Sequence, residues 1–500
     1  MKYYDYFCGG WLACSRRDPM PVGVEHAIAR LDHKSNNGSD ELSMMKICLQ
    51  SIVLLAALSL SQAAGAHGIY GDVNGDSEVD IADVNEVINV ILGSSVPVLP
   101  PDEPSCDTIP PVTVFDTNLS RRHYYRIPAI VELRDGRLMA IADDRHNSDA
   151  DIGGNSGIDI VGRLSADSGR TWGETFMIAN GVIVSNGFAN SHGDAAAVAD
   201  RETGRLLIMC ASGAQGFLSS TLQNPLQVGR YVSDDDGQTW SGDDVTSDIY
   251  GIFSQSPEVN ALFFSSGRIC QSRRIKVGDY YRIYSAVDGP MGVGCLVLYS
   301  DDFGQSWQAL GGPSARPTSA PWGDEAKVEE LPDGNVLLSC RSKQTATSGR
   351  LFNIYNYYTG SWGEMAVSND PETGTYSQDC SCNGELLIVP VRRTSDGRTM
   401  HLALQSVPRG KGRQCVSIYY KPLLEAGDYD EPADFSMGWN CYQVTENYSA
   451  YSTMVATTSG EIAFFHEDCN DNPSTTAYDL LFQRFSIKKI TDGRYTAITQ

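Results

Sequence analysis

The chain has 500 residues and a formal net charge of −24 at pH 7, from 62 Asp and Glu against 38 Lys and Arg. An acidic balance of this size argues against nucleic acid as a partner, because binding a phosphate backbone requires a basic face. With 48 Gly, 24 Tyr and 22 Pro, the composition favours a turn-rich all-β protein, and long amphipathic helices are hard to find.

The first 66 residues do not predict a stable domain. Residues 1–43 are short and mixed in charge, and we interpret them as an upstream extension that does not belong to the native protein. Residues 44–66 begin with two methionines and a lysine, continue with an apolar run and end in Ala-Gly-Ala. This is the pattern of a secretory signal peptide, with a buried helix as the alternative. We therefore expect translation to start at Met44 or Met45. The mature protein, beginning near His67, is expected to be secreted, periplasmic or on the cell surface, without a transmembrane helix.

Residues 67–93 contain an acidic loop followed by a helical pattern. Oxygen-bearing side chains at loop positions 1, 3, 5, 9 and 12 suit the coordination of calcium. The five candidate ligands are Asp72, Asn74, Asp76, Asp80 and Asp83. The segment resembles one half of a dockerin module, although Ser77 stands where glycine is usual and no second copy follows. We expect a small α-helical segment with a structural calcium site, and a docking partner is a weaker expectation. The alternative is an acidic turn that caps the helix through Asp83.

Six prolines fall within residues 94–113, among Ser, Asp and Glu. Proline biases the backbone toward extended polyproline II conformations and suppresses helix. This segment is therefore predicted to be a linker, and residues 114–500 read as strands and turns throughout.

The 13 cysteines include no Cys-x-x-Cys pair, and the closest two, Cys380 and Cys382, have one residue between them. This spacing argues against a tetrahedral zinc site. We expect structural or free thiols, with one or two disulfides as the alternative for an exported protein.

An octet of the form Ser-x-Asp-x-Gly-x-(Thr/Ser)-Trp occurs three times, at 165–172, 233–240 and 300–307. The tryptophans that close the octets are 68 and 67 residues apart. Self-similarity at this period indicates one supersecondary unit per repeat, and residues 114–500 hold about six such units. We therefore predict a six-bladed β-propeller with four-stranded antiparallel blades.

The aspartates of the octets are predicted to form turns. A short Asp side chain bonds downstream backbone amides, while Gly supplies a positive φ. An active site is needed only once, whereas the octet repeats. Asp167, Asp235 and Asp302 are therefore not candidates for catalysis.

The octets resemble the Asp boxes of sialidases, and Tyr125-Arg126-Ile127-Pro128 resembles the (Phe/Tyr)-Arg-Ile-Pro signature of that family. The resemblance extends over about residues 112 to 500 and includes single-copy segments between the octets. It implies a bacterial exo-α-sialidase that hydrolyses terminal α-linked sialic acid from glycoproteins, glycolipids or oligosaccharides. Sialylated glycoconjugates would be its partners, and catalysis would need no cofactor.

The resemblance also implies roles for residues in the second half of the chain. Glu325 matches the catalytic Glu, and Arg341, sixteen residues later and beyond a hairpin, matches the second arginine. The third arginine follows an apolar strand, which favours Arg398, with Arg393 as the alternative. Ser449 to Met454 matches the segment of the nucleophilic tyrosine. Tyr451 is thus preferred over Tyr448.

These residue types suit the chemistry of sialic acid, which carries a carboxylate on its anomeric carbon. Three guanidiniums, from Arg126, Arg341 and Arg398, could hold that carboxylate through bidentate hydrogen bonds. The carboxylate would repel an anionic nucleophile, and sialidases are the tyrosine exception among glycosidases. The resemblance therefore implies a retaining mechanism in which Glu325 deprotonates Tyr451 during attack.

An acid/base residue is implied by the pattern Asp-x-Arg-x-Asn-x-x-x-Asp, which runs from Asp143 to Asp151. It identifies Asp151 as the proton donor, with Asp149 as the alternative because loop length varies. Arg145 is expected to lie near the carboxylate or the acid/base as a supporting residue.

Two other functions remain open from the sequence. A trans-sialidase or an intramolecular trans-sialidase would share every residue named above. A non-catalytic carbohydrate-binding Asp-box propeller would require that Glu325, Tyr451 or Asp151 be misplaced.

Overall fold

The computed structural model describes residues 107, 109–117, 119, 122–154, 157–181, 190–290, 292–318, 323–342, 349–378, 382–469 and 477–498. The chain divides into two units, Met1–Glu103 and Pro104–Gln500. The predicted extension, signal peptide and calcium loop, with its ligands at 72–83, lie outside the described residues, as does most of the linker. Within the described ranges, none of the helices is both long and apolar enough to cross a bilayer.

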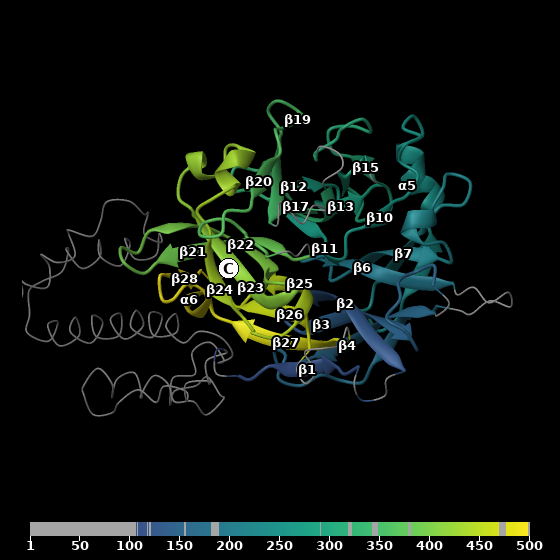
Figure 1. The fold of residues 1–500 in the computed structure, drawn as a ribbon, viewed down its shortest axis with the longest axis horizontal. Helices are drawn as coiled ribbons and strands as arrows, with labels where there is room; N and C mark the ends of the chain where they lie inside the picture. The colour runs from purple at the N-terminus through teal and green to yellow at the C-terminus, as the bar shows by residue number, and fades with distance from the viewer. Residues whose placement is uncertain are drawn as a thin grey trace, which may run out of the picture. The chain divides into compact units, whose positions relative to one another are not determined.

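Strands dominate the described residues and form six sheets, which confirms the all-β prediction (Figure 1). The first sheet has the order β2-β3-β4-β5 (His123–Glu132, Leu138–His146, Ile158–Ser165, Phe176–Ala179). The second has the order β11-β6-β7-β8-β9 (Gly267–Arg268, Ser191–Ala199, Leu206–Gly213, Gln227–Ser233, Ser241–Asp244). The third joins β10, β12, β13, β14 and β15 (Phe263–Phe264, Cys270–Val277, Tyr280–Asp288, Cys295–Ser300, Gln308–Ala309).

The other three sheets use the second half of the chain. The fourth joins β16, β17, β18, β19 and β20 (Gly323–Glu330, Val336–Ser342, Arg350–Asn356, Ser361–Trp362, Ala366–Ser368). The fifth has the order β24-β23-β22-β21-β28 (Asn440–Gln443, Gln414–Leu423, Thr399–Gly410, Leu386–Arg393, Tyr495–Ala497). The sixth has the order β1-β27-β26-β25 (Val112–Phe115, Asp479–Phe485, Ile462–Asp468, Ser449–Ala456). The described helices are short: η2, α5, η4, η5 and α6 (Phe217–Ser219, Thr246–Ile252, Ala426–Asp428, Pro432–Phe435, Ile487–Ile490).

The strand count differs from the expected four per sheet, because four of the six sheets have five strands. The pairing is antiparallel except between β11 and β6, which run parallel with Gly267 opposite Ala196. A two-residue strand such as β11 is too short to show an alternating pattern, so only the packed structure reveals it.

The sheets follow one another and return to the start. Strand β1, from the beginning of the described chain, pairs with β27 near its end. Strand β2 contacts both β6 and β25, and β21 contacts both β16 and β25. Apolar clusters fill the space between neighbouring sheets, such as Ile130, Phe465 and Phe482 between the first and the sixth. Burial of these faces drives the packing of sheet on sheet.

The octet turns form as predicted. The Asp167 carboxylate accepts a hydrogen bond from the Thr171 amide at 2.9 Å, and the same bond is 2.8 Å long at Asp235 and at Asp302. Gly169 has a φ of 87°, and a Cβ there would lie 1.9 Å from the ring of Phe482. Glycine is therefore required both by the turn and by the close approach of the sixth sheet.

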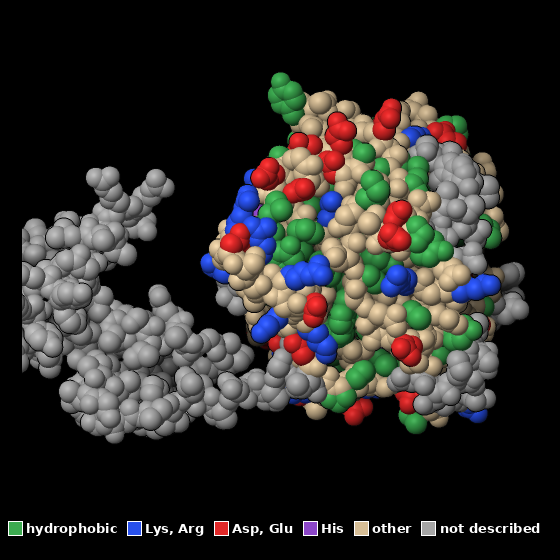
Figure 2. Space-filling model, turned by 60° about the vertical axis from the view of Figure 1, so that its left-hand side comes forward, with side chains coloured by type: hydrophobic (Ala, Val, Ile, Leu, Met, Phe, Trp, Pro, Cys, Tyr) green, Lys and Arg blue, Asp and Glu red, His purple; other side chains and the backbone are tan. Residues whose placement is uncertain are grey.

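Figure 2 shows acidic and basic side chains interspersed with apolar ones over one face of the described chain. No continuous basic surface covers that face.

Candidate active site

Strand direction brings the predicted residues to one end of the sheets. Arg126, Glu325 and Tyr451 lie near the starts of β2, β16 and β25, the first long strands of their sheets. Arg341 lies near the end of β17, opposite Asp324 in the antiparallel pairing with β16. Because antiparallel neighbours reverse direction, the start of one strand lies beside the end of the next.

Glu325, Tyr451 and Arg341 form a triangle of mutual contacts. The Tyr451 hydroxyl donates a short hydrogen bond to Glu325 Oε1. Arg341 Nη1 donates to Glu325 Oε2 at 2.7 Å and lies 3.2 Å from the Tyr451 hydroxyl. Both Glu325 and Tyr451 are buried, at 7% and 6% exposure. The Tyr451 phenol and the Glu325 carboxylate, 126 residues apart in the sequence, are thus joined by a direct hydrogen bond.

The charges of this triangle keep the tyrosine protonated and the glutamate ionised. Burial, followed by the negative charge of Glu325, raises the pKa of Tyr451 well above its ordinary value. Burial alone would raise the pKa of Glu325 as well. The positive charge of Arg341 and the hydrogen bonds from Tyr451 and Arg341 outweigh burial and hold that pKa below its ordinary value. Glu325 is therefore ionised and accepts the hydrogen bond of a neutral phenol.

Glu467 on β26 connects Arg126 to the tyrosine strand. Arg126 Nε donates to Glu467 Oε1 at 2.6 Å, and the Ile127 amide donates to the same oxygen at 3.0 Å. Glu467 Oε2 accepts the Tyr451 amide at 3.0 Å. The guanidinium carbon of Arg126 lies 5.7 Å from the centre of the Tyr451 ring and 5.3 Å from that of Tyr478. Sequence reasoning missed Glu467, since no local pattern marks it.

Arg398, the third arginine predicted from the sequence, does not lie in this cluster. It precedes β22, its side chain is 49% exposed, and its Nη2 is 3.8 Å from Glu425. The alternative, Arg393, pairs with Asp396 in the same turn. Strand β22 has 12 residues and spans about 36 Å, so its two ends are far apart.

Arg413 follows the other end of β22 and does approach the tyrosine. Its guanidinium carbon lies 5.6 Å from the centre of the Tyr451 ring. The Arg413 carbonyl accepts the Ser449 amide at 2.8 Å, which ties this turn to the start of β25. The direction of the strands could have identified Arg413. Arg341 lies near the end of β17 and Arg413 just beyond the end of β22, and each of these is the second strand of its sheet in chain order.

Arg145 holds the predicted acid/base loop. It is 1% exposed, and its Nη2 donates to Asp143 at 2.9 Å. Its Nη1 donates to Asp151 Oδ1 at 2.5 Å and to the backbone carbonyl of Asp149 at 2.8 Å. The Asp151 side chain is 87% exposed. Arg145 thus orients the carboxylate of Asp151 while contacting Asp149 through its backbone.

Two further acids, not predicted from the sequence, link this loop to the triangle. Burial raises the pKa of Asp143 to about 6, although the charge of Arg145 opposes the shift. Burial and the charge of Asp143 raise the pKa of Asp194 well above its ordinary value, with smaller contributions from Asp151 and Glu325. The Asp194 amide donates to Asp143 at 3.0 Å. Asp194 has a φ of 58° and lies in a bulge of β6, which composition does not predict.

No described residue belongs to the predicted calcium loop. One other group of metal-ligating side chains occurs among the described residues, formed by Asp144, His146 and Asp159. It lies on the opposite face of β3 from Asp143 and Arg145, because side chains alternate along a strand.

The chain is similar in sequence to bacterial sialidases. It is 29% identical over 358 residues to a sialidase from Micromonospora viridifaciens, covering 69% of this chain and 50% of the relative. It is 28% identical over 332 residues to a sialidase from Paraclostridium sordellii, covering 61% of this chain and 74% of the relative. The chain therefore spans about half the length of the first of these relatives.

Solved structures share the fold at lower identity. A Hadza microbial sialidase superposes with a TM-score of 0.57 at 21% identity, covering 76% of this chain and 68% of that one. The intramolecular trans-sialidase of Ruminococcus gnavus superposes with a TM-score of 0.58 at 17% identity, covering 76% and 98%. The fold is thus that of the sialidases, which are β-propellers.

A family model described as the BNR repeat-like domain matches residues 136–460. The match includes all three octets, and it contains Glu325, Arg341 and Tyr451. Because it spans more than half of the chain, the protein belongs to the BNR repeat-like domain family.

Proposed function

We propose that the protein is an exo-α-sialidase with a six-bladed propeller fold that hydrolyses terminal α-linked sialic acid with retention. The observation that carries this proposal is the Tyr451 hydroxyl hydrogen-bonded to the buried Glu325, with Arg341 on both groups. The sialidases that resemble the chain support the same reaction.

Three guanidiniums would hold the substrate carboxylate: those of Arg126, Arg341 and Arg413. Each lies in contact with Tyr451, either through its hydroxyl or over its ring. A carboxylate placed among them would have its charge neutralised by planar donors that remain protonated. It would also set the anomeric carbon beside the phenol oxygen.

In the first step, the Tyr451 oxygen forms a bond to the anomeric carbon as its proton passes to Glu325. The bond from that carbon to the leaving oxygen breaks, and Asp151 donates a proton to the departing alcohol. In the second step, Asp151 takes a proton from water, which attacks the anomeric carbon. The tyrosyl bond breaks, and Glu325 returns the proton to Tyr451, so that the configuration is retained.

A transfer reaction is the second candidate. One structural neighbour is the intramolecular trans-sialidase of Ruminococcus gnavus, and another is a leech intramolecular trans-sialidase. Both reactions use a glycosyl-enzyme intermediate and differ in what resolves it. Attack by water gives free sialic acid, whereas attack by a hydroxyl of the same sugar gives an anhydro sugar.

Further proposals follow from the sequence. The chain is proposed to be secreted, periplasmic or cell-surface, to act on sialylated glycoconjugates, and to hold a structural calcium ion at residues 72–83. A calcium titration by calorimetry tests the last point, and its failure would leave the sialidase proposal standing.

The test is incubation of the purified full chain with sialyllactose, with the products followed by NMR in real time. The expected first product is free sialic acid in the α configuration. An anhydro product would instead support intramolecular transfer. No turnover of any α-sialoside would contradict both enzymatic readings and leave a carbohydrate-binding propeller.

A further inference from the structure

The register of the first sheet places two histidines and two aspartates on one face. His123 on β2 lies opposite His146 on β3, and Asp144 on β3 lies opposite Asp159 on β4. Asp144 and His146 are two residues apart and therefore point to the same side of the sheet. Strands β2, β3 and β4 are hydrogen-bonded neighbours and lie side by side in Figure 1.

The donor atoms of these side chains converge. His146 Nε2 lies 2.7 Å from Asp159 Oδ2, and His123 Nδ1 lies 2.8 and 2.9 Å from the two carboxylate oxygens of Asp144. The ligand atoms of Asp144, His146 and Asp159 all lie within 4.8 Å of one another. The rings of His123 and His146 are 5.5 Å apart. Three potential ligands, Asp144, His146 and Asp159, thus border one small volume, and His123 adjoins it through its contact with Asp144.

Burial and a supporting hydrogen bond make this group different from a solvated acidic patch. The side chains of Asp144 and Asp159 are only 9% and 5% exposed, while those of His123 and His146 are 41% and 37% exposed. Asp159 Oδ1 accepts the Gly181 amide at 2.6 Å, which orients Oδ2 toward His146. Such second contacts are what hold a ligating carboxylate in place. The imidazoles leave a path to solvent through which an ion can arrive.

We propose that Asp144, His146 and Asp159 form a zinc-binding site on the face of the first sheet opposite Asp143 and Arg145, with His123 moving in as the fourth ligand. Two imidazoles and two carboxylates match the four-coordinate chemistry of Zn²⁺, whose ligands lie at about 2.0 to 2.2 Å from the ion. Donor atoms in such a tetrahedron are about 3.3 Å apart. The contacts at 2.7 to 2.9 Å would open slightly on binding, the separations of up to 4.8 Å within the group would close, and the His123 ring would move in. Calcium and magnesium favour oxygen ligands alone and fit this set poorly.

The site lies on the opposite face of β3 from Arg145, which binds the proposed acid/base. Side chains alternate along β3, so Asp144 and His146 face the metal while Asp143 and Arg145 face the candidate active site. The chain turns immediately after His146 at Asn147, whose φ is 59°. Arg145 then binds Asp151 across the loop. Zinc would fix the end of β3 to both neighbouring strands and thereby position Arg145 and Asp151.

Metal binding itself is tested with Zn²⁺ on the chelator-stripped full chain, by calorimetry in excess Ca²⁺ so that the acidic loop at residues 72–83 does not compete. The expected result is one Zn²⁺ per chain with a rise in melting temperature. His146→Gln and Asp159→Asn should each weaken binding at least about 100-fold. His401→Gln, a histidine on β22 in the fifth sheet, is the matched control and should bind as the wild type does.

Two further measurements keep the proposal falsifiable. If His146→Gln fails to fold, His123→Gln changes a 41% exposed side chain and should also weaken binding. Substitution with Co²⁺ should give the visible spectrum of a tetrahedral nitrogen and oxygen site. Zinc binding that survives these substitutions, or a thiolate charge-transfer band from cysteine ligation, would overturn the proposal. Failure of the wild-type chain to bind zinc would also overturn it, because the His–Asp contacts would then be hydrogen bonds only.

The positioning effect rests on the proposed sialidase function, whereas the metal titration does not. Loss of zinc should lower kcat about 10-fold for a natural sialoside, whose poor leaving group needs the proton from Asp151. A substrate with an activated phenol leaving group needs no such proton and should be cleaved at nearly the wild-type rate. Equal losses for both substrates would contradict the positioning role. An inactive wild type that binds zinc would reject only the sialidase proposal.

Discussion

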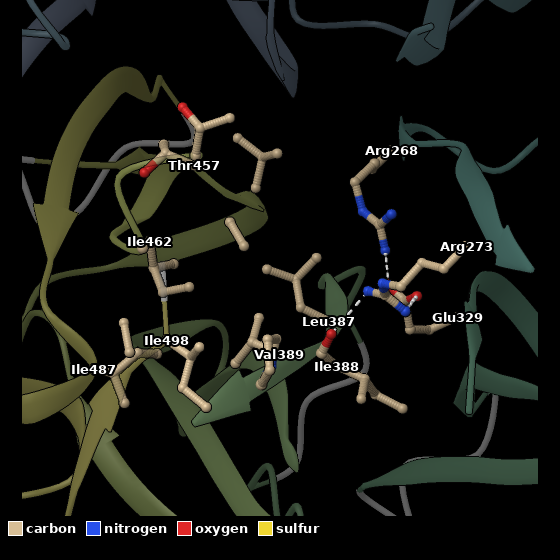
Figure 3. A pocket seen from close by; sticks show the side chains of 16 residues that line it. Arg268, Arg273, Glu329, Leu387, Ile388, Val389, Thr457, Ile462, Ile487 and Ile498 are labelled. Atoms are coloured by element: carbon tan, nitrogen blue, oxygen red, sulfur yellow. Dashed lines mark hydrogen bonds and ion pairs between the residues drawn. The ribbon is translucent and has the colours of Figure 1, made fainter. Parts of the chain in front are cut away.

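The two ends of β16 carry the same kind of ion pair with different outcomes. Glu325 and Glu329 are four residues apart on one strand and face the same side. Glu325 contacts Arg341 and Tyr451. Glu329 contacts Arg268 and Arg273 beside a cavity of about 190 Å³, as Figure 3 shows. Both carboxylates are buried, and nearby arginines hold the pKa of each below its ordinary value although burial opposes this.

The difference lies in what the second oxygen binds. At Glu329 each oxygen accepts from an arginine, and the described residues that line the cavity are mostly apolar and include no tyrosine. At Glu325 one oxygen accepts from Arg341 and the other from the Tyr451 hydroxyl. A carboxylate whose charge is balanced by arginines holds strands together, whereas one that receives the proton of a nucleophile can take part in a reaction.

The largest expected effect is on catalysis, and it comes from removing the proposed nucleophile. Tyr451→Phe removes the attacking oxygen and should lower kcat for a natural sialoside by about 1000-fold or more. Tyr448→Phe, three residues earlier and partly buried, is the matched control and should keep full activity. Steady-state kinetics on sialyllactose measure both. Equal activity of the two variants would show that the triangle at Glu325 is structural, like the pair at Glu329.

The converse experiment breaks the other end of β16. Glu329→Gln removes the main counter-charge of Arg268 and Arg273 and should lower the free energy of unfolding by about 3 kcal/mol. The enzyme that remains folded should keep its kcat, because Glu329 does not touch the candidate active site. Denaturant unfolding and kinetics at a temperature below the transition measure the two quantities. A large fall in kcat without loss of stability would reverse the assignment.

The third prediction concerns the arginine that strand polarity selects. Arg413→Ala removes a charge beside Tyr451 and should lower kcat/KM by about 100-fold, the value of a strong charge-assisted contact. Arg398→Ala, at the other end of β22, should change kcat/KM less than about 2-fold. Competition by a free sialic acid carboxylate should weaken only in the first variant. Similar losses of kcat/KM in both variants would mean that neither Arg413 nor Arg398 is the third arginine that binds the substrate carboxylate.

The arginine pair shows how far the sequence alone could reach. The octets could be predicted because each is a local turn whose Asp, Gly and Trp lie within eight residues. Glu325 and Arg341 could be predicted because one hairpin connects them. Arg398 was chosen on its distance from apolar strands, but membership of the site depends on which end of a strand points toward it.

Contacts between strands that are distant in the sequence could not be predicted from it. Glu467 meets Arg126 across 341 residues of chain, and neither residue has a local pattern that indicates the other. The same holds for His146 and Asp159, which come together only through the register of β3 and β4. The cysteine spacing argued against zinc, yet it bears only on sites built from cysteines. Pairing of strands, more than residue type, therefore limits what can be predicted.

The smallest expected effect is the pH dependence of Glu325. Because its pKa is lower in the folded protein than the unfolded value of about 4.3, its ionised form stabilises the fold above that pH. This contribution is lost as the pH falls through the lower, folded value. The difference in unfolding free energy between wild type and Glu325→Gln should thus be constant from pH 7 to about 5 and shrink below about 4. Arg341→Gln removes the largest influence that lowers the pKa, so in that background the folded pKa should rise toward or above the unfolded value, and the loss of stability at acid pH should shrink or reverse. Urea unfolding at each pH measures both curves, and parallel curves in the two backgrounds would mean that Arg341 does not set the ionisation of Glu325.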